Sequence, residues 1–168
     1  LRPGARVVDL GAAPGGWSEL AAERVLPAGQ VVALDRLPMP ELPGVEFLLG
    51  DFTEREVLNE LLAILDGQPV DLVISDMSPN ISGVRTVDQP AAIYLCELAA
   101  ELANQVLRPG GSLLMKVFEG EGVDELRRLL QVRYKRLLVR KPAASRSRSR
   151  EFYLLAQEFK AEYSVFSL

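Results

Sequence analysis

The chain contains no histidine and only one cysteine among its 168 residues. The lack of histidine removes the most frequent general base and the most frequent metal ligand, and one cysteine cannot complete a zinc site. We therefore predict no metal cofactor, and we expect Lys, Asp, Glu or Tyr to carry any proton transfer. Cys96 lies in an apolar helical pattern, which predicts a core residue without an internal disulfide, as in a reducing, cytoplasmic compartment.

A long apolar run is missing too. No run approaches the ~20 residues of a membrane-spanning helix, so we predict no membrane partner. The length fits one domain, and neither a repeat nor a second domain is visible. We therefore expect residues 1–168 to form a single domain.

Acidic residues are absent from one segment. Residues 127–150 contain ten Lys or Arg and no Asp or Glu, whereas residues 1–126 contain 20 Asp or Glu and 8 Lys or Arg. A concentrated positive charge is typical of proteins that bind a polyanion such as nucleic acid. A solvated surface that balances the acidic part of the chain explains the pattern equally well.

What is present is an alternation of strands and helices. Near-continuous aliphatic runs predict strands at residues 6–10, 31–35, 45–51, 70–76, 112–118, 136–141 and 151–159. Apolar residues at helical spacing predict helices at residues 16–26, 54–65, 90–107 and 122–132. Asp88 and Pro90 suit the start of the third helix. This order predicts an α/β fold with an open sheet.

Aspartates lie at or next to the carboxyl end of four of the first five predicted strands, at positions 9, 35, 51 and 76. Ligands of open α/β sheets bind at the carboxyl ends of the strands. Capping of the following helices would explain any one of these residues. Four in the same row favour a ligand site.

The first strand runs into a glycine-rich turn, DLGAAPGGW, at residues 9–17. A dinucleotide-binding turn has a second glycine where this chain has Ala13, and that glycine lets the backbone approach a pyrophosphate. Asp35 follows Gly11 by 24 residues, where a carboxylate can accept hydrogen bonds from ribose hydroxyls. The turn therefore favours an adenosine-bearing cofactor without a pyrophosphate over a nicotinamide cofactor.

Five segments, in this order, resemble the FtsJ-type ribosomal RNA ribose 2′-O-methyltransferases: DLGAAPGGWSE, LLGDFTE, SDMSPNISG, MKVFEGEG and KPAASRSRSREFYLLA. The resemblance implies a Rossmann-like methyltransferase fold, with a mostly parallel seven-stranded sheet and helices on both faces. It also implies transfer of a methyl group from S-adenosylmethionine to a ribose 2′-OH, at a uridine of the RNA of the large ribosomal subunit. We further expect a monomer.

The resemblance also implies which residues bind the cofactor. Gly15 and Trp17 would lie at its methionine end, Asp35 would hold the ribose, and Asp51 would hold the adenine edge with Phe52 beside the ring. Packing between helix and sheet is the alternative explanation of Trp17.

Lys116 stands out because it interrupts the apolar strand LLMKVF, and a buried lysine is rare unless it is paired or functional. Burial favours a neutral amine that can act as a base, whereas a carboxylate at Asp76 would favour the charged form. The resemblance implies that Lys116 accepts the proton, that Asp76 and Glu151 position it, and that Asp76 also borders the cofactor. A lysine that reaches out to solvent is the alternative.

The serine-arginine tract before Glu151 would place Arg146, Arg148 and Arg150 beside this centre, where they could bind phosphates. A disordered tract is the alternative.

Two other functions stay open. The motif Asp76-Met77-Ser78-Pro79-Asn80 is faintly similar to that of methyltransferases that modify base amino groups, but Asn80 stands where those enzymes have an aromatic residue. The family also has a lysine in a basic segment before the first strand, and this sequence shows none. We therefore expect cofactor binding with weak methyl transfer, and a catalytically weak RNA-binding or ribosome-assembly module is the alternative function.

Overall fold

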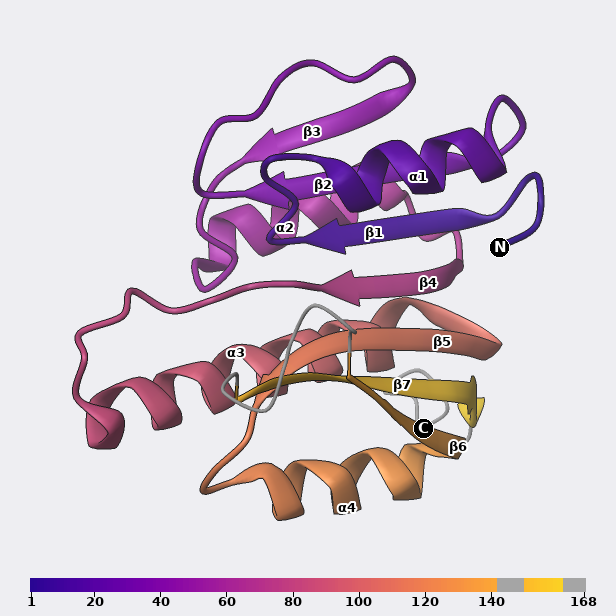
Figure 1. Cartoon of the computed structure of the whole chain (residues 1–168). Coiled ribbons are helices and arrows are strands. Elements are labelled where there is room, and N and C mark those ends of the chain that lie inside the picture. The colour runs from indigo at the N-terminus through magenta and orange to yellow at the C-terminus, as the bar shows by residue number, and fades with distance from the viewer. Residues whose placement is uncertain (142–149, 162–168) are drawn as a thin grey trace.

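The computed structural model describes residues 1–141 and 150–161. These residues form one seven-stranded sheet and four helices (Figure 1). The strands are β1 (Arg6–Leu10), β2 (Gln30–Asp35), β3 (Val45–Leu49), β4 (Val70–Ser75), β5 (Leu107–Phe118), β6 (Tyr134–Arg140) and β7 (Glu151–Phe159). The helices are α1 (Gly16–Val25), α2 (Arg55–Leu65), α3 (Arg85–Val106) and α4 (Val123–Arg133).

The sheet has the strand order β3-β2-β1-β4-β5-β7-β6. The first five of these strands run parallel to one another, and β7 is antiparallel to both of its neighbours. The predicted mostly parallel seven-stranded sheet is therefore confirmed. The chain moves outward from β1 to β3 and then returns to the other side of β1 as β4, so the strand order reverses between β1 and β4. The arrowheads of β1 to β4 point to one edge in Figure 1, and the reversal marks that edge as a ligand site.

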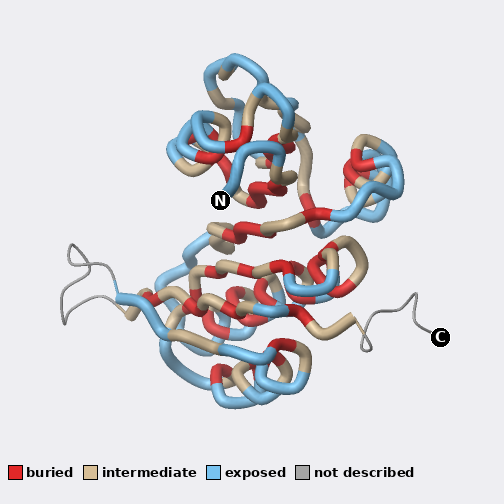
Figure 2. The backbone as a smooth tube through the Cα atoms, turned by 90° about the vertical axis from the view of Figure 1, so that its right-hand side faces the viewer, coloured by how far each residue is buried: buried red, intermediate tan, exposed pale blue. Residues whose placement is uncertain are grey.

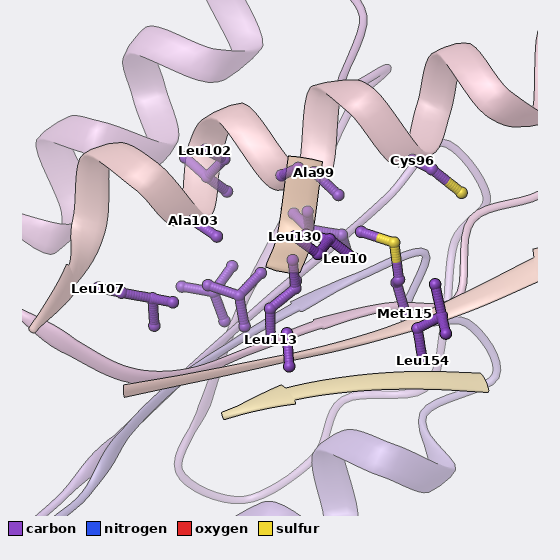
Figure 3. Packing of buried hydrophobic residues seen from close by; sticks show 14 of the residues in the cluster. Leu10, Cys96, Ala99, Leu102, Ala103, Leu107, Leu113, Met115, Leu130 and Leu154 are labelled. Atoms are coloured by element: carbon purple, nitrogen blue, oxygen red, sulfur yellow. The ribbon is translucent and has the colours of Figure 1, made fainter. Parts of the chain in front are cut away.

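The larger part of the core lies between the sheet and α3. Cys96, Ala99 and Ala103 are small side chains, and they let α3 approach Leu113 and Met115 of β5 closely (Figure 3). Burial raises the pKa of the Cys96 thiol to about 12, so the thiol stays protonated, as expected of a core cysteine.

The opposite face of the sheet is covered by α1. Ala21 and Val25 of this helix pack against Val7 and Val31 of the two central strands. Buried residues therefore run through the strands and the inward faces of the helices, while the outer faces are exposed (Figure 2). Helices on both faces are thus confirmed as well. No helix in residues 1–141 and 150–161 is both long and apolar enough to span a membrane.

The third helix begins earlier than predicted. It starts at Arg85, and Pro90 lies within it. Asp88 is in the first turn, where its carboxylate accepts hydrogen bonds from the backbone N–H groups of Ser82 and Gly83 at 2.9 and 3.0 Å. The aspartate that suggested a helix start therefore ties down the loop before the helix.

The turn after β1 depends on Gly11, which has a φ of +73°. A Cβ at this position would lie 2.7 Å from the backbone nitrogen of Met77 and 2.9 Å from the carbonyl carbon of Asp76. These are backbone atoms, which cannot rotate away. The ends of β1 and β4 can therefore lie this close together only because residue 11 has no side chain.

We predict that Gly11→Ala destabilises the protein by roughly 1–3 kcal/mol more than Gly67→Ala. Gly67 has almost the same φ, +72°, but a Cβ there would meet nothing within 4 Å. Both variants place a side chain on a residue with positive φ, but only Gly11→Ala also brings a Cβ into steric overlap with backbone atoms. Urea unfolding at 25 °C measures the difference, and equal free energies of unfolding for the two variants would contradict the prediction.

Candidate active site

A cavity of about 510 Å³ opens at the carboxyl edge of the sheet. It lies where the strand order reverses, and Gly11, Asp35, Asp51, Asp76 and Lys116 line it. Gly11, Asp35, Asp51 and Asp76 end or follow the first four strands, Lys116 lies near the end of β5, and the parallel strands bring these residues to one edge. A cavity of the size that small ligands occupy therefore lies at the edge where the sequence predicted a ligand site.

The glycine-rich turn is held by the second strand. Gly11 and Ala12 donate backbone hydrogen bonds to the carbonyl oxygen of Leu34 at 2.8 and 3.1 Å. Asp35 accepts from the backbone N–H of Ala13 at 2.8 Å and from that of Leu37 at 2.9 Å. Asp35 thus shapes the loops on both sides of the cavity, while each of its oxygens keeps capacity for a further hydrogen bond.

Asp51 and Phe52, which follow β3, also line the cavity. The Thr53 hydroxyl donates to Asp51 at 2.7 Å and the Thr53 backbone N–H donates at 2.8 Å. These hydrogen bonds, the side-chain one first, lower the pKa of Asp51, so its carboxylate is ionised at neutral pH. An ionised carboxylate beside an aromatic ring offers an acceptor and an apolar face to a heterocycle that carries an amino group.

Gly15 and Trp17 do not line the cavity. Gly15 precedes α1 with a φ of +115°, and a Cβ there would come within 3.0 Å of the Leu42 side chain. Trp17 packs against the α1 side of the sheet, and its ring lies edge-on to that of Tyr153, with centroids 6.3 Å apart. The contacts of Trp17 are therefore those of the alternative explanation, packing between helix and sheet. Through its ring contact with Tyr153, Trp17 also lies close to the residues around Lys116.

Lys116 lies inside the structure, with only 11% of its side chain exposed. Its Nζ is 3.4 Å from Asp76 Oδ1 and donates to Ser78 Oγ at 2.8 Å. The Nζ also lies 5.6 Å from the centre of the Phe118 ring. The side chain therefore reaches into the cavity wall between β4 and β5, and it does not extend into bulk solvent.

Tyr153 completes this group, and sequence reasoning missed it. It is the β7 partner of Lys116 in the antiparallel ladder, and its hydroxyl donates to Asp76 Oδ1 at 3.2 Å. Burial, followed by the charge of Asp76, raises the pKa of Tyr153 to about 12, so the hydroxyl is a permanent donor at neutral pH. The sequence feature that could have identified Tyr153 is its position two residues after Glu151, because residues two apart in a strand project from the same face.

Glu151 faces the same side of the sheet from the start of β7. Its ladder partner is Phe118, so it is a diagonal neighbour of Lys116. Its charge contributes to the raised pKa of Tyr153. Lys116, Asp76 and Glu151 thus come from three strands to one corner of the sheet, although Glu151 does not line the cavity.

Asp9, the remaining strand-end aspartate, lies beneath the glycine-rich turn. It is completely buried and accepts a hydrogen bond from Ser18 of α1 at 2.7 Å, and its second oxygen has no partner in the described part of the chain. Burial raises its pKa to about 7, and the charges of Asp76 and Asp35 act in the same direction. Asp9 therefore joins β1 to α1, and it does not line the cavity.

Arg150 is engaged by the protein itself. Its guanidinium donates to the carbonyl oxygen of Glu119 and to the side chain of Gln89, which is itself buried. These contacts connect the start of β7 to the turn before α4. The Arg150 guanidinium therefore binds groups of the protein itself, which argues against the phosphate-binding role predicted for it. Arg146 and Arg148 lie outside the described residues.

Comparison with known proteins identifies the family. A model of the FtsJ-like methyltransferases matches residues 1–159. The chain belongs to the FtsJ-like methyltransferase family. It is 62% identical over 159 residues to the ribosomal RNA large subunit methyltransferase E of Alkalilimnicola ehrlichii. The aligned residues make up 95% of this chain and 76% of that protein. It is 56% identical to the protein of the same name from Chromohalobacter salexigens, with the same coverage of both chains.

Solved structures show the same fold at low sequence identity. A Plasmodium falciparum protein described as a ribosomal RNA methyltransferase has a TM-score of 0.82 at 22% identity, covering 94% of this chain and 88% of that chain. A Streptococcus mutans protein described as a methyltransferase in complex with SAH has a TM-score of 0.63 at 14% identity, covering 95% and 89% of the two chains.

These comparisons confirm the predicted family, the methyltransferase activity and S-adenosylmethionine as the methyl donor. The nicotinamide alternative is excluded, as Ala13 in the turn had indicated.

We predict that the stability of the protein falls as the pH rises from about 4 to about 7, and that Asp9→Asn removes most of this dependence. The folded state keeps on Asp9 a proton that the unfolded chain releases near the ordinary carboxyl pKa of 3.8. Ionisation of Asp9 therefore destabilises the folded state, by up to about 4 kcal/mol above pH 7. Urea unfolding at pH 5 and pH 8 measures the effect.

Asp66→Asn is the control, because Asp66 is exposed at the end of α2 and the substitution removes the same charge. The wild type and the Asp66 variant should lose the same stability between the two pH values. If Asp9→Asn loses as much as they do, the buried carboxyl is not the origin of the pH dependence.

Proposed function

We propose that the chain transfers a methyl group from S-adenosylmethionine to a ribose 2′-OH of ribosomal RNA, at a uridine of the large subunit. The observation that carries the proposal is the placement of Lys116 Nζ, in the wall of a nucleoside-sized cavity and within 3.4 Å of Asp76. The curated relatives above, named for the RNA of the large subunit, support the substrate. We propose as well that the chain acts as a monomer.

The cavity fits the cofactor. Gly11 leaves the turn open to a ligand, and Asp35 and Asp51 are acceptors for ribose hydroxyls and for an adenine amino group. Phe52, almost fully buried, gives the heterocycle a flat apolar wall. When bound, S-adenosylmethionine supplies a methyl group on a positively charged sulfur, which keeps the electrons of the carbon–sulfur bond when the methyl group leaves.

The residues around Lys116 supply the proton chemistry. A ribose hydroxyl becomes a useful nucleophile only as its proton is removed, and a neutral Lys116 amine can accept that proton. Asp76 fixes the position of Nζ and stabilises the ammonium group that forms. Tyr153 donates to the same Asp76 oxygen and therefore holds that carboxylate in place. Since the chain has no histidine, no imidazole can take over this role.

The environment favours a hydroxyl over a base amino group as the acceptor. Asn80 lines the cavity where the enzymes that modify base amino groups have an aromatic ring that stacks on the base. An exocyclic amine also needs no strong base, because its lone pair attacks directly. A lysine base held beside the cavity matches the needs of an alcohol instead.

The function is tested with tritiated S-adenosylmethionine and large ribosomal subunits that lack the modification. Label should enter the ribosomal RNA and should remain in dinucleotides after alkaline hydrolysis, because a methylated 2′-oxygen cannot attack the neighbouring phosphate. Label in a free mononucleotide would indicate base methylation and refute the proposal. RNA binding without any label would favour the assembly module instead.

We predict that Lys116→Met lowers the rate of methyl transfer by at least about 100-fold, because general base catalysis contributes this much or more. Methionine keeps the apolar stem, so the affinity for S-adenosylmethionine, measured by calorimetry, should stay close to that of the wild type. Lys160→Met, beyond the far end of β7, is the matched control and should keep full activity. Near-full activity of the Lys116 variant would show that another group accepts the proton.

A further inference from the structure

The basic residues of the chain divide into those that hold the fold together and those that are available. Arg133 forms an ion pair with Glu101 at 2.9 Å, and the Arg127 guanidinium lies 5.6 Å from the centre of the Phe152 ring. Arg150 is bound to carbonyl and amide oxygens. The net charge of the segment therefore does not show which residues could meet a substrate.

The strand register places Arg140 in the same row of the sheet as Lys116. Tyr153 of β7 has Lys116 as its partner on β5 and Arg140 as its partner on β6. Partners in an antiparallel ladder project from the same face of the sheet. The row from Lys116 through Tyr153 to Arg140 therefore crosses three strands, and Asp76 extends it on the other side, because Ser75 pairs with Met115.

Arg140 is also exposed. It ends the edge strand of the sheet, and among the described residues its guanidinium donates to the carbonyl oxygen of the adjacent Val139, at 3.1 Å. Within residues 1–141 and 150–161 it forms no ion pair. Neighbouring strands bring partner Cα atoms to about 5 Å, so its Cα lies about 10 Å from that of Lys116.

We propose that Arg140 binds a backbone phosphate of the RNA next to the ribose at Lys116, which rests on the proposed function above. The ribose that presents its 2′-OH to Lys116 carries a phosphate on either side, and a guanidinium binds phosphate through two parallel hydrogen bonds. Arg136 lies on the same face four residues earlier on β6, about 13 Å away, and continues the positive charge along the edge. This edge of the sheet therefore positions the RNA without reading its sequence.

The test measures binding of a fluorescein-labelled single-stranded RNA at increasing KCl concentrations. Loss of one phosphate contact should reduce the slope of log K against log salt by about 0.7 to 1. We expect this reduction for Arg140→Gln, and we expect Arg140→Lys, which keeps the charge, to restore most of the slope. The affinity for S-adenosylmethionine should be unchanged in both variants.

Arg128→Gln is the matched control. Arg128 is exposed on α4, a helix that packs on the opposite face of the sheet, so the substitution removes the same charge from the same basic segment. Its salt slope should equal that of the wild type. Equal slopes for Arg128→Gln and Arg140→Gln, or no RNA binding by the wild type, would overturn the inference.

Methyl transfer measured in parallel separates the two proposals. Arg140→Gln should raise the KM for RNA with little change in kcat, whereas loss of the base at Lys116 lowers kcat. If the wild type binds RNA with the predicted difference between the arginine variants but labels no 2′-oxygen, the proposed reaction fails and the binding surface stands. If it labels the 2′-oxygen and the variants are alike, the binding surface alone fails.

Discussion

The structure around the cavity depends on one constraint, the alignment of Lys116 on β5 with Tyr153 on β7 beside the end of β4. This register places the Lys116 amine within ion-pairing distance and the Tyr153 phenol within hydrogen-bonding distance of the Asp76 carboxylate. A shift of one residue in either strand would turn these side chains to the opposite face, into the apolar layer beneath α3. The apolar residues that alternate with them, such as Met115 and Leu154, therefore fix the catalytic geometry through their own burial.

The same edge of the sheet collects negative charge, and the structure limits the repulsion in different ways. Asp35 is satisfied by backbone N–H groups, Asp76 by a lysine and a tyrosine, and Asp51 by Thr53. Asp9 is completely buried, and its raised pKa lets it hold a proton near neutral pH. Protonation of the carboxyl beneath the turn therefore removes one negative charge from this crowded edge of the sheet.

Sequence reasoning predicted the fold and the edge of the sheet at which the cavity opens, because both depend on local pattern. Apolar runs and helical spacing gave the elements to within a few residues, and the strand-end positions of Asp35 and Asp76 placed them at the cavity. It did not predict Tyr153, whose role comes from a pairing between strands 37 residues apart in the chain. It also could not tell that Asp9 lies beneath α1, because Asp9 and the strand-end aspartates that line the cavity have the same local signature.

The arginines show why charge composition alone could not define a binding surface. Arg150 immediately precedes Glu151, so sequence proximity favoured it as a substrate contact, yet the turn before α4 has carbonyl oxygens that need a donor and Arg150 supplies it. Arg140 is eleven residues from Glu151 in the chain, but the antiparallel pairing of β6 with β7 returns it to the row of Lys116. Position relative to Lys116 is thus set by strand register. Within residues 1–141 and 150–161, the Arg140 guanidinium at the open edge of the sheet donates to the carbonyl oxygen of Val139 and pairs with no carboxylate, which is why we propose it as the phosphate contact.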